Sequence, residues 1–131
     1  MSRFAGVACC VIVMLGVGSL TACHHGSESR VAYTPQQLAA IQADFQRANP
    51  NARVGVVSAV AADANLATVG RVKPRDFRMN DVVTFIDAEG RILTSGSVSG
   101  TAGGDLQVRY AQPREGGRIP RVGDLAVRAI Q

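Results

Sequence analysis

The hydrophobic periodicity changes at Asn49-Pro50, and this change constrains the fold more than any other feature of the chain. Before it, Leu38, Ile41 and Phe45 recur at the spacing of one helix face. After it, apolar and polar residues alternate in short runs that are separated by turns, which is the pattern of antiparallel strands. The sequence therefore predicts a mainly β domain with one N-terminal amphipathic helix.

The expected helix has clear signals at both ends. Thr34 can cap it, Pro35 suits the first helical position, and Gln37 completes a capping box. Asn49-Pro50 is expected to end it. We predict that its apolar stripe packs on a core and that its polar face assembles no site; that face holds Gln36, Gln42, Asp44, Gln46 and Arg47.

About six strands are expected beyond the helix. The apolar runs that predict them lie at 54–60, 66–72, 81–87, 91–99, 106–110 and 125–130. Residues 81–87 carry apolar side chains on both faces, which is typical of a central strand, and Gly100 to Gly104 is predicted to be a glycine-rich turn. Short strands with tight turns favour a small antiparallel barrel or sandwich.

Two loops share the same turn chemistry. Pro74-Arg75 leads to Asn80-Asp81, and Pro120-Arg121 leads to Gly123-Asp124; an apolar strand follows each aspartate. Glycine and asparagine adopt left-handed conformations at low cost, and aspartate can accept hydrogen bonds from the neighbouring backbone. The two turns resemble the Gly-Asp turn of small SH3-like β-barrels, including those on periplasmic proteins. This resemblance covers a short part of the chain, implies a barrel, and assigns no functional residue.

The N-terminal segment has the pattern of an export signal. Arg3 precedes the uncharged run from Phe4 to Ala22, which ends in small residues. The stretch Leu20-Thr21-Ala22-Cys23 resembles the lipobox of bacterial lipoproteins. In that class the leader is cut before the cysteine, which then carries acyl chains, so the resemblance implies a mature chain that begins at Cys23. The same run is also long enough for an uncleaved helical anchor, and both alternatives export the chain that follows.

The chain is thus predicted to have three parts. Residues 1–22 are the signal peptide, residues 23–33 a lipidated tether, and residues 34–131 the helix with a small barrel-like domain. Cys9 and Cys10 would leave with the leader, so Cys23 would be the single cysteine of the mature chain. An intramolecular disulfide is then impossible, and the domain depends on its own packing.

The residue types in the expected domain exclude several kinds of catalysis. His24 and His25 are the only histidines and lie in the tether, so the domain has neither imidazole nor thiol. Ser-His-Asp and Cys-His catalysis and zinc sites of cysteine and histidine need these groups. The carboxylates Asp87 and Glu89 lie in a presumed hairpin turn, where solubility and turn bonding account for them. We expect no enzyme activity, no metal, no cofactor and no nucleic-acid partner.

Basic residues gather in two loops. Without Arg3 the chain has 13 basic and 10 acidic residues. If the two loops lie together, as their similar turns suggest, they would form a patch that attracts anions, and arginine suits phosphate and carboxylate groups. The alternative is that these charges only keep the domain soluble. The candidate anion-binding residues are Arg71, Lys73, Arg75, Arg78, Arg118 and Arg121.

Two functional classes remain. The first is a membrane-anchored envelope lipoprotein that acts as a non-enzymatic interaction or scaffolding module and docks on another envelope protein through an exposed strand edge. The second binds an anionic envelope polymer or lipid head group through the basic loops. Lipoproteins kept in the inner membrane of Gram-negative bacteria commonly carry aspartate after the cysteine, whereas this chain has His24. That resemblance implies the periplasmic face of the outer membrane in a cell with two membranes, with acyl chains on Cys23 as the anchor.

Overall fold

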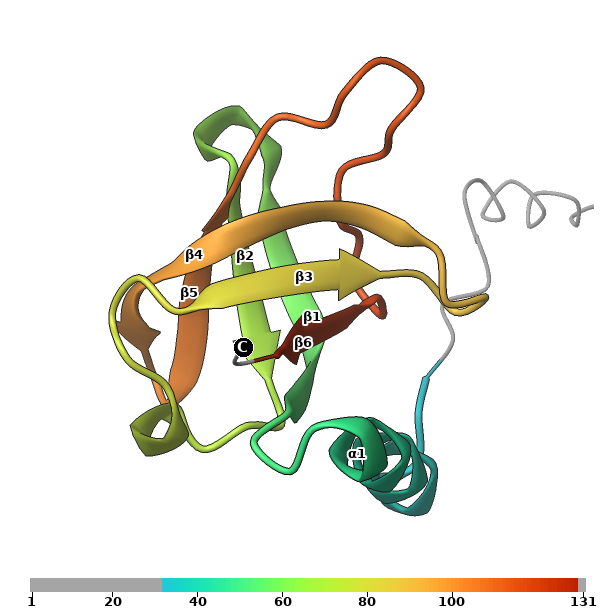
Figure 1. Ribbon diagram of the computed structural model, residues 1–131. Helices are drawn as coiled ribbons and strands as arrows, with labels where there is room; N and C mark the ends of the chain where they lie inside the picture. Colours follow the sequence, from blue (N-terminus) through green and yellow to red (C-terminus); the bar gives the residue numbers. More distant parts are fainter. Residues whose placement is uncertain (1–31, 130–131) are drawn as a thin grey trace, which may run out of the picture.

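The computed structural model describes residues 32–129 and shows a closed antiparallel β-barrel with one helix packed against it (Figure 1). This confirms the predicted fold class and selects the barrel over the sandwich. The predicted signal peptide, residues 1–22, and most of the predicted tether, Cys23 included, lie outside the described residues. The elements in chain order are α1 (Pro35–Ala48), β1 (Arg53–Ala61), β2 (Leu66–Gly70), β3 (Val82–Ile86), β4 (Ile92–Ala102), β5 (Asp105–Tyr110) and β6 (Leu125–Arg128), with short 3-10 turns at Ala62–Ala64 and Pro74–Asp76.

The strands follow one another around the barrel in the order β1-β2-β5-β4-β3-β6, and β6 pairs with β1 to close it. The turn predicted from Gly100 to Gly104 is shorter than expected, because β4 continues to Ala102. The left-handed residues there are Gly103 and Gly104, with φ of 61° and 90°. Closure gives every strand two neighbours along at least part of its length, so docking through an exposed strand edge loses its main support.

Helix α1 forms as the sequence predicts and is fastened to the barrel by its polar side as well. The Thr34 hydroxyl accepts a hydrogen bond from the Gln37 N–H at 3.2 Å, and the Gln37 side chain accepts from the Thr34 N–H at 2.8 Å, which completes the capping box. The Gln42 side chain accepts from the Val54 N–H and donates to the Ala52 carbonyl, both at 2.7 Å. The polar face therefore helps to dock the helix on the start of β1.

Two apolar clusters hold the fold together. The first fills the barrel and contains Phe85, Leu106 and Val57 among its most buried side chains. The second lies between the barrel wall and α1, where Leu38 packs with residues of β1, β3 and β6. Strand β6 is buried throughout, because alternate residues serve the two clusters: Ala126 packs in the first and Leu125 and Val127 in the second.

The barrel is built from two equivalent halves, β1–β3 and β4–β6. Strand β1 pairs with β2 and β6, and β4 pairs in the same way with β5 and β3. The register shifts directly after Val57 in the first half and directly after Val98 in the second. The serine after each of these valines donates its hydroxyl to a carbonyl of the neighbouring strand at 3.2 Å, Ser58 to Thr68 and Ser99 to Gln107. Each half thus repeats one hairpin, one bulge and one returning strand.

The two turns that look alike in the sequence occupy equivalent places in the halves. The Asp81 carboxylate accepts from the Arg78 N–H at 2.8 Å, and the Asp124 carboxylate accepts from the Arg121 N–H at 2.7 Å. The residue before each aspartate is left-handed, as the sequence indicates, with φ of 71° at Asn80 and 99° at Gly123. Because β3 and β6 run antiparallel, the two turns lie at opposite ends of this strand pair.

Candidate functional site

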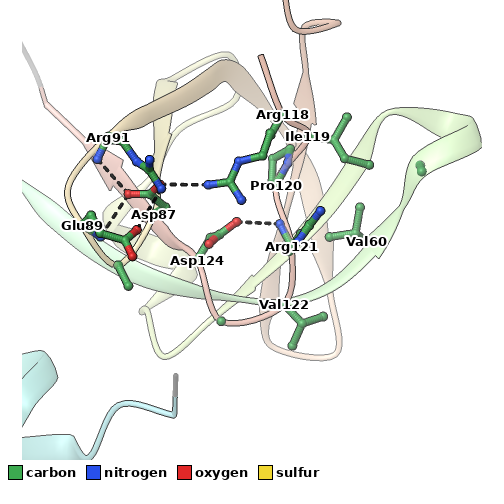
Figure 2. Close-up of a pocket in the computed structure, with 13 residues that line it drawn as sticks. Val60, Asp87, Glu89, Arg91, Arg118, Ile119, Pro120, Arg121, Val122 and Asp124 are labelled. Carbon is green, nitrogen blue, oxygen red and sulfur yellow. Dashed lines mark hydrogen bonds and ion pairs between the residues drawn. The ribbon is translucent and has the colours of Figure 1, made fainter. Parts of the chain in front are cut away.

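A hollow with a volume of about 720 Å³ lies between the end of β1, the β3–β4 hairpin and the segment before β6 (Figure 2). Three arginines and three carboxylates line it, together with aliphatic side chains. The charged residues are Asp87, Glu89, Arg91, Arg118, Arg121 and Asp124, and the apolar ones include Val60, Ile119, Pro120 and Val122. Its walls therefore combine both signs of charge with apolar surface.

Asp87 is the best-connected side chain in this hollow, with 5% of its side chain exposed. Its Oδ1 atom accepts hydrogen bonds from the N–H groups of Glu89 at 3.0 Å and Arg91 at 2.9 Å. Its Oδ2 atom accepts from Arg91 Nε at 2.8 Å and from Arg118 Nη2 at 2.9 Å. Figure 2 shows this carboxylate between the two guanidinium groups. Asp87 thus joins the β3–β4 hairpin to the segment that leads into β6.

These contacts determine the charge state of Asp87. Burial disfavours the ionised form, but the hydrogen bonds from the backbone and side chain of Arg91 outweigh it and hold the pKa of Asp87 below its usual value. The turn bonding predicted for this residue is confirmed. Solubility, the other reason expected for a carboxylate here, does not account for Asp87, because the residue is buried and donors surround its two oxygens. With its acceptor positions occupied, Asp87 acts as a structural anchor.

Asp124 lies in the same hollow, and its pKa shifts in the opposite direction. Burial raises the pKa of Asp124, and the negative charge of Asp87 adds to the rise, against the hydrogen bond from the Arg121 N–H and the charge of Arg118. Burial and the charge of Asp124 also raise the pKa of the Tyr33 hydroxyl. The sequence predicts the turn bond of Asp124 but not this crowding of negative charge.

The six basic residues proposed as an anion site are divided by the structure. Arg118 and Arg121 line the hollow just described, where carboxylates balance them. Arg71 and Lys73 line a smaller hollow of about 180 Å³ beside α1, together with Arg53 and Asp76. Arg75 and Arg78 are exposed on the segment that follows. The two matching turns lie at opposite ends of the β3–β6 pair, although Arg71 lines one hollow with Val122 and Gly123 of the second loop. Whether any of these residues binds an anion stays a prediction.

A buried arginine is the main residue that the sequence did not single out. Arg128, at the end of β6, lies 3.0 Å from the Asp81 carboxylate and donates to the carbonyl groups of Asp76 and of Asn51, the latter at 3.2 Å. Its guanidinium carbon lies 4.8 Å from the centre of the Phe77 ring. Its inward position in β6, two residues after the buried Ala126, is the signal that could have indicated this role. Arg128 closes one end of the barrel and is not available to an external ligand.

The described part of the chain offers neither an evident metal centre nor a spanning helix. Within residues 32–129, His, Cys, Asp and Glu side chains form no group of three or more that could hold a metal ion. In the same range, α1 does not have the length and apolar character that a bilayer-crossing helix requires.

Comparisons with known proteins identify no family for this chain. The sequence matches no family model, and neither the curated proteins nor the solved structures gave a match. Function is therefore inferred from the residues and their geometry.

Proposed function

We propose that this protein is an exported lipoprotein, anchored by acyl chains on Cys23, whose barrel is a non-enzymatic docking module for another envelope protein. In a cell with two membranes, the proposed location is the periplasmic face of the outer membrane. The lipobox-like stretch Leu20-Thr21-Ala22-Cys23 carries the anchoring part, because it follows an apolar leader and supplies the one cysteine that would remain after cleavage. Several acyl chains together give stable membrane residence.

The large hollow supports the docking part of the proposal. Two of its three arginines, Arg91 and Arg118, are already paired with carboxylates, so the hollow does not present a cluster of unpaired cations that would attract a polyanion. Between the charges, the aliphatic side chain of Ile119 is 37% exposed. Mixed charge with exposed aliphatic groups complements a peptide segment of another protein that carries both polar and apolar side chains.

Anchoring is tested by changing the cysteine. We expect Cys23→Ala to abolish acylation, measured by mass spectrometry of the N-terminal peptide, and to move the protein out of the membrane fraction. Cys9→Ala and Cys10→Ala are the matched controls, since both lie in the leader and should leave the mature protein unchanged. An intact Met1 end, or a free thiol at position 23 in native material, would refute the proposal.

Docking is tested by photocrosslinking in intact cells. A photoreactive residue at Ile119 should capture one defined envelope protein, and the same residue at the exposed Ser95 on β4 should not. Capture should also persist when isolated membranes are irradiated in high salt, because apolar contacts at the hollow resist screening. Equal capture from the two positions would count against a specific docking surface.

A second candidate function, binding of an anionic polymer, is favoured by one observation. Arg53, Arg71 and Lys73 line the smaller hollow against the single carboxylate of Asp76. Retention of the full protein on immobilised polyphosphate should then fall steeply between low and high salt. Retention should also be lost when Arg71 and Lys73 are neutralised, whereas salt-resistant retention would exclude this candidate.

A further inference from the structure

A third hollow, of about 290 Å³, lies where the chain enters the described structure, and it differs from the other two in being mainly apolar. It is lined by Ala32 and Tyr33, by Val56 and Val57 of β1, and by Val122 and Gly123 of the turn before β6. Val122 is 38% exposed, so an aliphatic side chain stands open to the surroundings at its rim. The hollow is open at the surface and has no occupant among residues 32–129.

A cation stands at the edge of this apolar surface. Arg71 lines the apolar hollow and also the smaller basic hollow, where Lys73 and Arg53 accompany it. Arg71 is exposed and has a φ of 60°, in the left-handed region, directly after the end of β2. Within the described residues, no carboxylate forms an ion pair with Arg71 or Lys73. An apolar surface therefore continues into a surface with unpaired positive charge.

The length of chain before Ala32 limits what this face can meet. Cys23 lies nine residues before Ala32, and nine residues span about 30 Å when fully extended and about 17 Å on average as a flexible chain. A domain of this size has a radius of gyration of about 13 Å. If Cys23 is held in a membrane, the face that carries Ala32 and Tyr33 is thus the part of the barrel kept nearest to the lipid.

We propose that the face formed by Tyr33, Val122 and Arg71 rests on the phospholipid surface, with the aliphatic rim in the interface and Arg71 and Lys73 bound to head-group phosphates. This inference deepens the proposed function and rests on its lipid anchor at Cys23. Aliphatic side chains combined with unpaired cations are the chemistry that binds an anionic bilayer surface. Docked in this way, the barrel would hold a fixed orientation and present the opposite turn, at Met79, to the periplasm.

The equivalent halves of the barrel supply a matched pair of probes. Met79 occupies in the first half the turn position that Val122 occupies in the second, and it is 61% exposed at the other end of the β3–β6 pair. The full chain, processed in cells, would be purified with Val122→Cys or Met79→Cys and labelled at the new thiol, since Cys23 carries lipid. Labelled protein is then placed in vesicles of phosphatidylethanolamine and phosphatidylglycerol that contain a lipid-borne quencher.

We expect the fluorophore at position 122 to be quenched at least about threefold more strongly than the one at position 79. Replacing Arg71 by Asn, which tolerates a positive φ, and Lys73 by Gln should reduce this difference, whereas Arg71→Lys with Lys73→Arg should preserve it. Phosphatidylcholine vesicles should also reduce it, because their head groups carry no net charge. Thermal unfolding of each variant shows that the barrel is intact.

The outcomes separate this inference from the proposed function. Mass spectrometry of the same samples reports acylation of Cys23 independently of quenching. An acylated protein with equal quenching at positions 79 and 122 would overturn the membrane-facing surface and leave the lipoprotein proposal standing. A photoreactive residue at position 122 that captures a protein in cells in place of lipid would overturn it as well. Lack of acylation would refute both proposals together.

Discussion

Asp81 and Asp124 accept the same backbone hydrogen bond in two equivalent turns, but Asp81 lies 3.0 Å from the Arg128 guanidinium, whereas Asp124 is crowded by the charge of Asp87. The same turn thus occurs in two different electrostatic environments. The hydrogen bond from the Arg78 N–H, with help from Arg128, holds the pKa of Asp81 below its usual value. Burial and Asp87 raise the pKa of Asp124. The turn fixes the backbone around both aspartates. The neighbouring residue on the paired strand, Arg128 for Asp81 and Asp87 for Asp124, sets the local charge.

Replacing each aspartate by asparagine separates these effects. Asparagine can still accept the turn hydrogen bond, so only the charge is lost. We expect Asp81→Asn to lower the free energy of unfolding at pH 7 by about 2 kcal/mol, because it removes the negative charge that pairs with the buried Arg128. Asp124→Asn should be neutral or slightly stabilising at the same pH. Urea unfolding measures both, and equal losses in the two variants would contradict this assignment.

The stability of the protein should respond to acid in two opposite ways, called the two limbs of its pH dependence. Asp81 and Asp87 have pKa values below the usual 3.8, so their contribution is present above 3.8 and is lost as the pH falls through their lower pKa values. Asp124 behaves in the opposite way: its pKa in the folded protein is raised, so its charge lowers stability above that pKa, and stability increases as the pH falls through it toward 3.8.

Thermal unfolding from pH 7 to pH 3 measures both limbs. The wild-type protein should become slightly more stable on mild acidification and then lose stability in strong acid. In Asp124→Asn the first increase should disappear while the acid loss remains. A curve for Asp124→Asn that parallels the wild type throughout would show that Asp124 is not the group responsible.

The sequence predicts the local features of this fold well because each has a local cause. The helix cap at Thr34 depends on residues within one turn, and the left-handed conformations at Asn80 and Gly123 depend on the residue type at each position. Closure of the barrel could not be predicted, because it requires β6 to pair with both β1 and β3. The bulges after Val57 and Val98 also escape detection, since no glycine or proline marks the residue that follows either valine.

The candidate site was less predictable than the fold. The similar turns suggested that the two basic loops lie together, but the antiparallel pairing of β3 and β6 puts the turns at opposite ends. Asp87 looked like an ordinary turn residue because its partner Arg118 is distant in the sequence. Arg128 looked like one more basic residue of the C-terminal region, although the register of β6 turns it toward Asp81. Each difference comes from a contact between distant segments.

Arg118 should control the mobility of the segment before β6. Its Nη2 atom donates to the Asp87 carboxylate at 2.9 Å and ties residues 111–124 to the β3–β4 hairpin. Loss of this contact should speed amide exchange in the segment where local opening governs it, and the increase should be modest because the Arg118 side chain is 44% exposed. We therefore expect Arg118→Ala to increase exchange there while the exchange of β4 and β5 stays unchanged.

Arg114 is the matched control for this prediction, because it is an exposed arginine of the same segment. Arg114→Ala changes the net charge by the same amount and should leave exchange near the wild-type rate. Faster exchange in Arg114→Ala to the same extent would attribute the effect to overall charge and not to the contact with Asp87.

At Gly96 strands β4 and β5 leave no room for a side chain. A Cβ atom there would meet the backbone of β5, with Tyr110 Cα at 2.7 Å. Gly55, on β1, would meet the Val69 side chain at 2.5 Å and the Gly70 carbonyl oxygen at 2.9 Å. Backbone cannot move aside without breaking the ladder, so we expect Gly96→Ala to cost about 3 kcal/mol and Gly55→Ala somewhat less.

Gly100 tests whether this loss comes from crowding and not from alanine as such. It lies on the same strand as Gly96, has no atom within 4 Å of its Cβ position, and does not need a positive φ. Gly100→Ala should therefore be neutral or stabilise the protein by under about 1 kcal/mol, since alanine restricts the unfolded chain. Urea unfolding of Gly96→Ala, Gly55→Ala and Gly100→Ala measures their relative stabilities. Equal stability of Gly96→Ala and Gly100→Ala would contradict the close approach of β4 and β5 at Gly96.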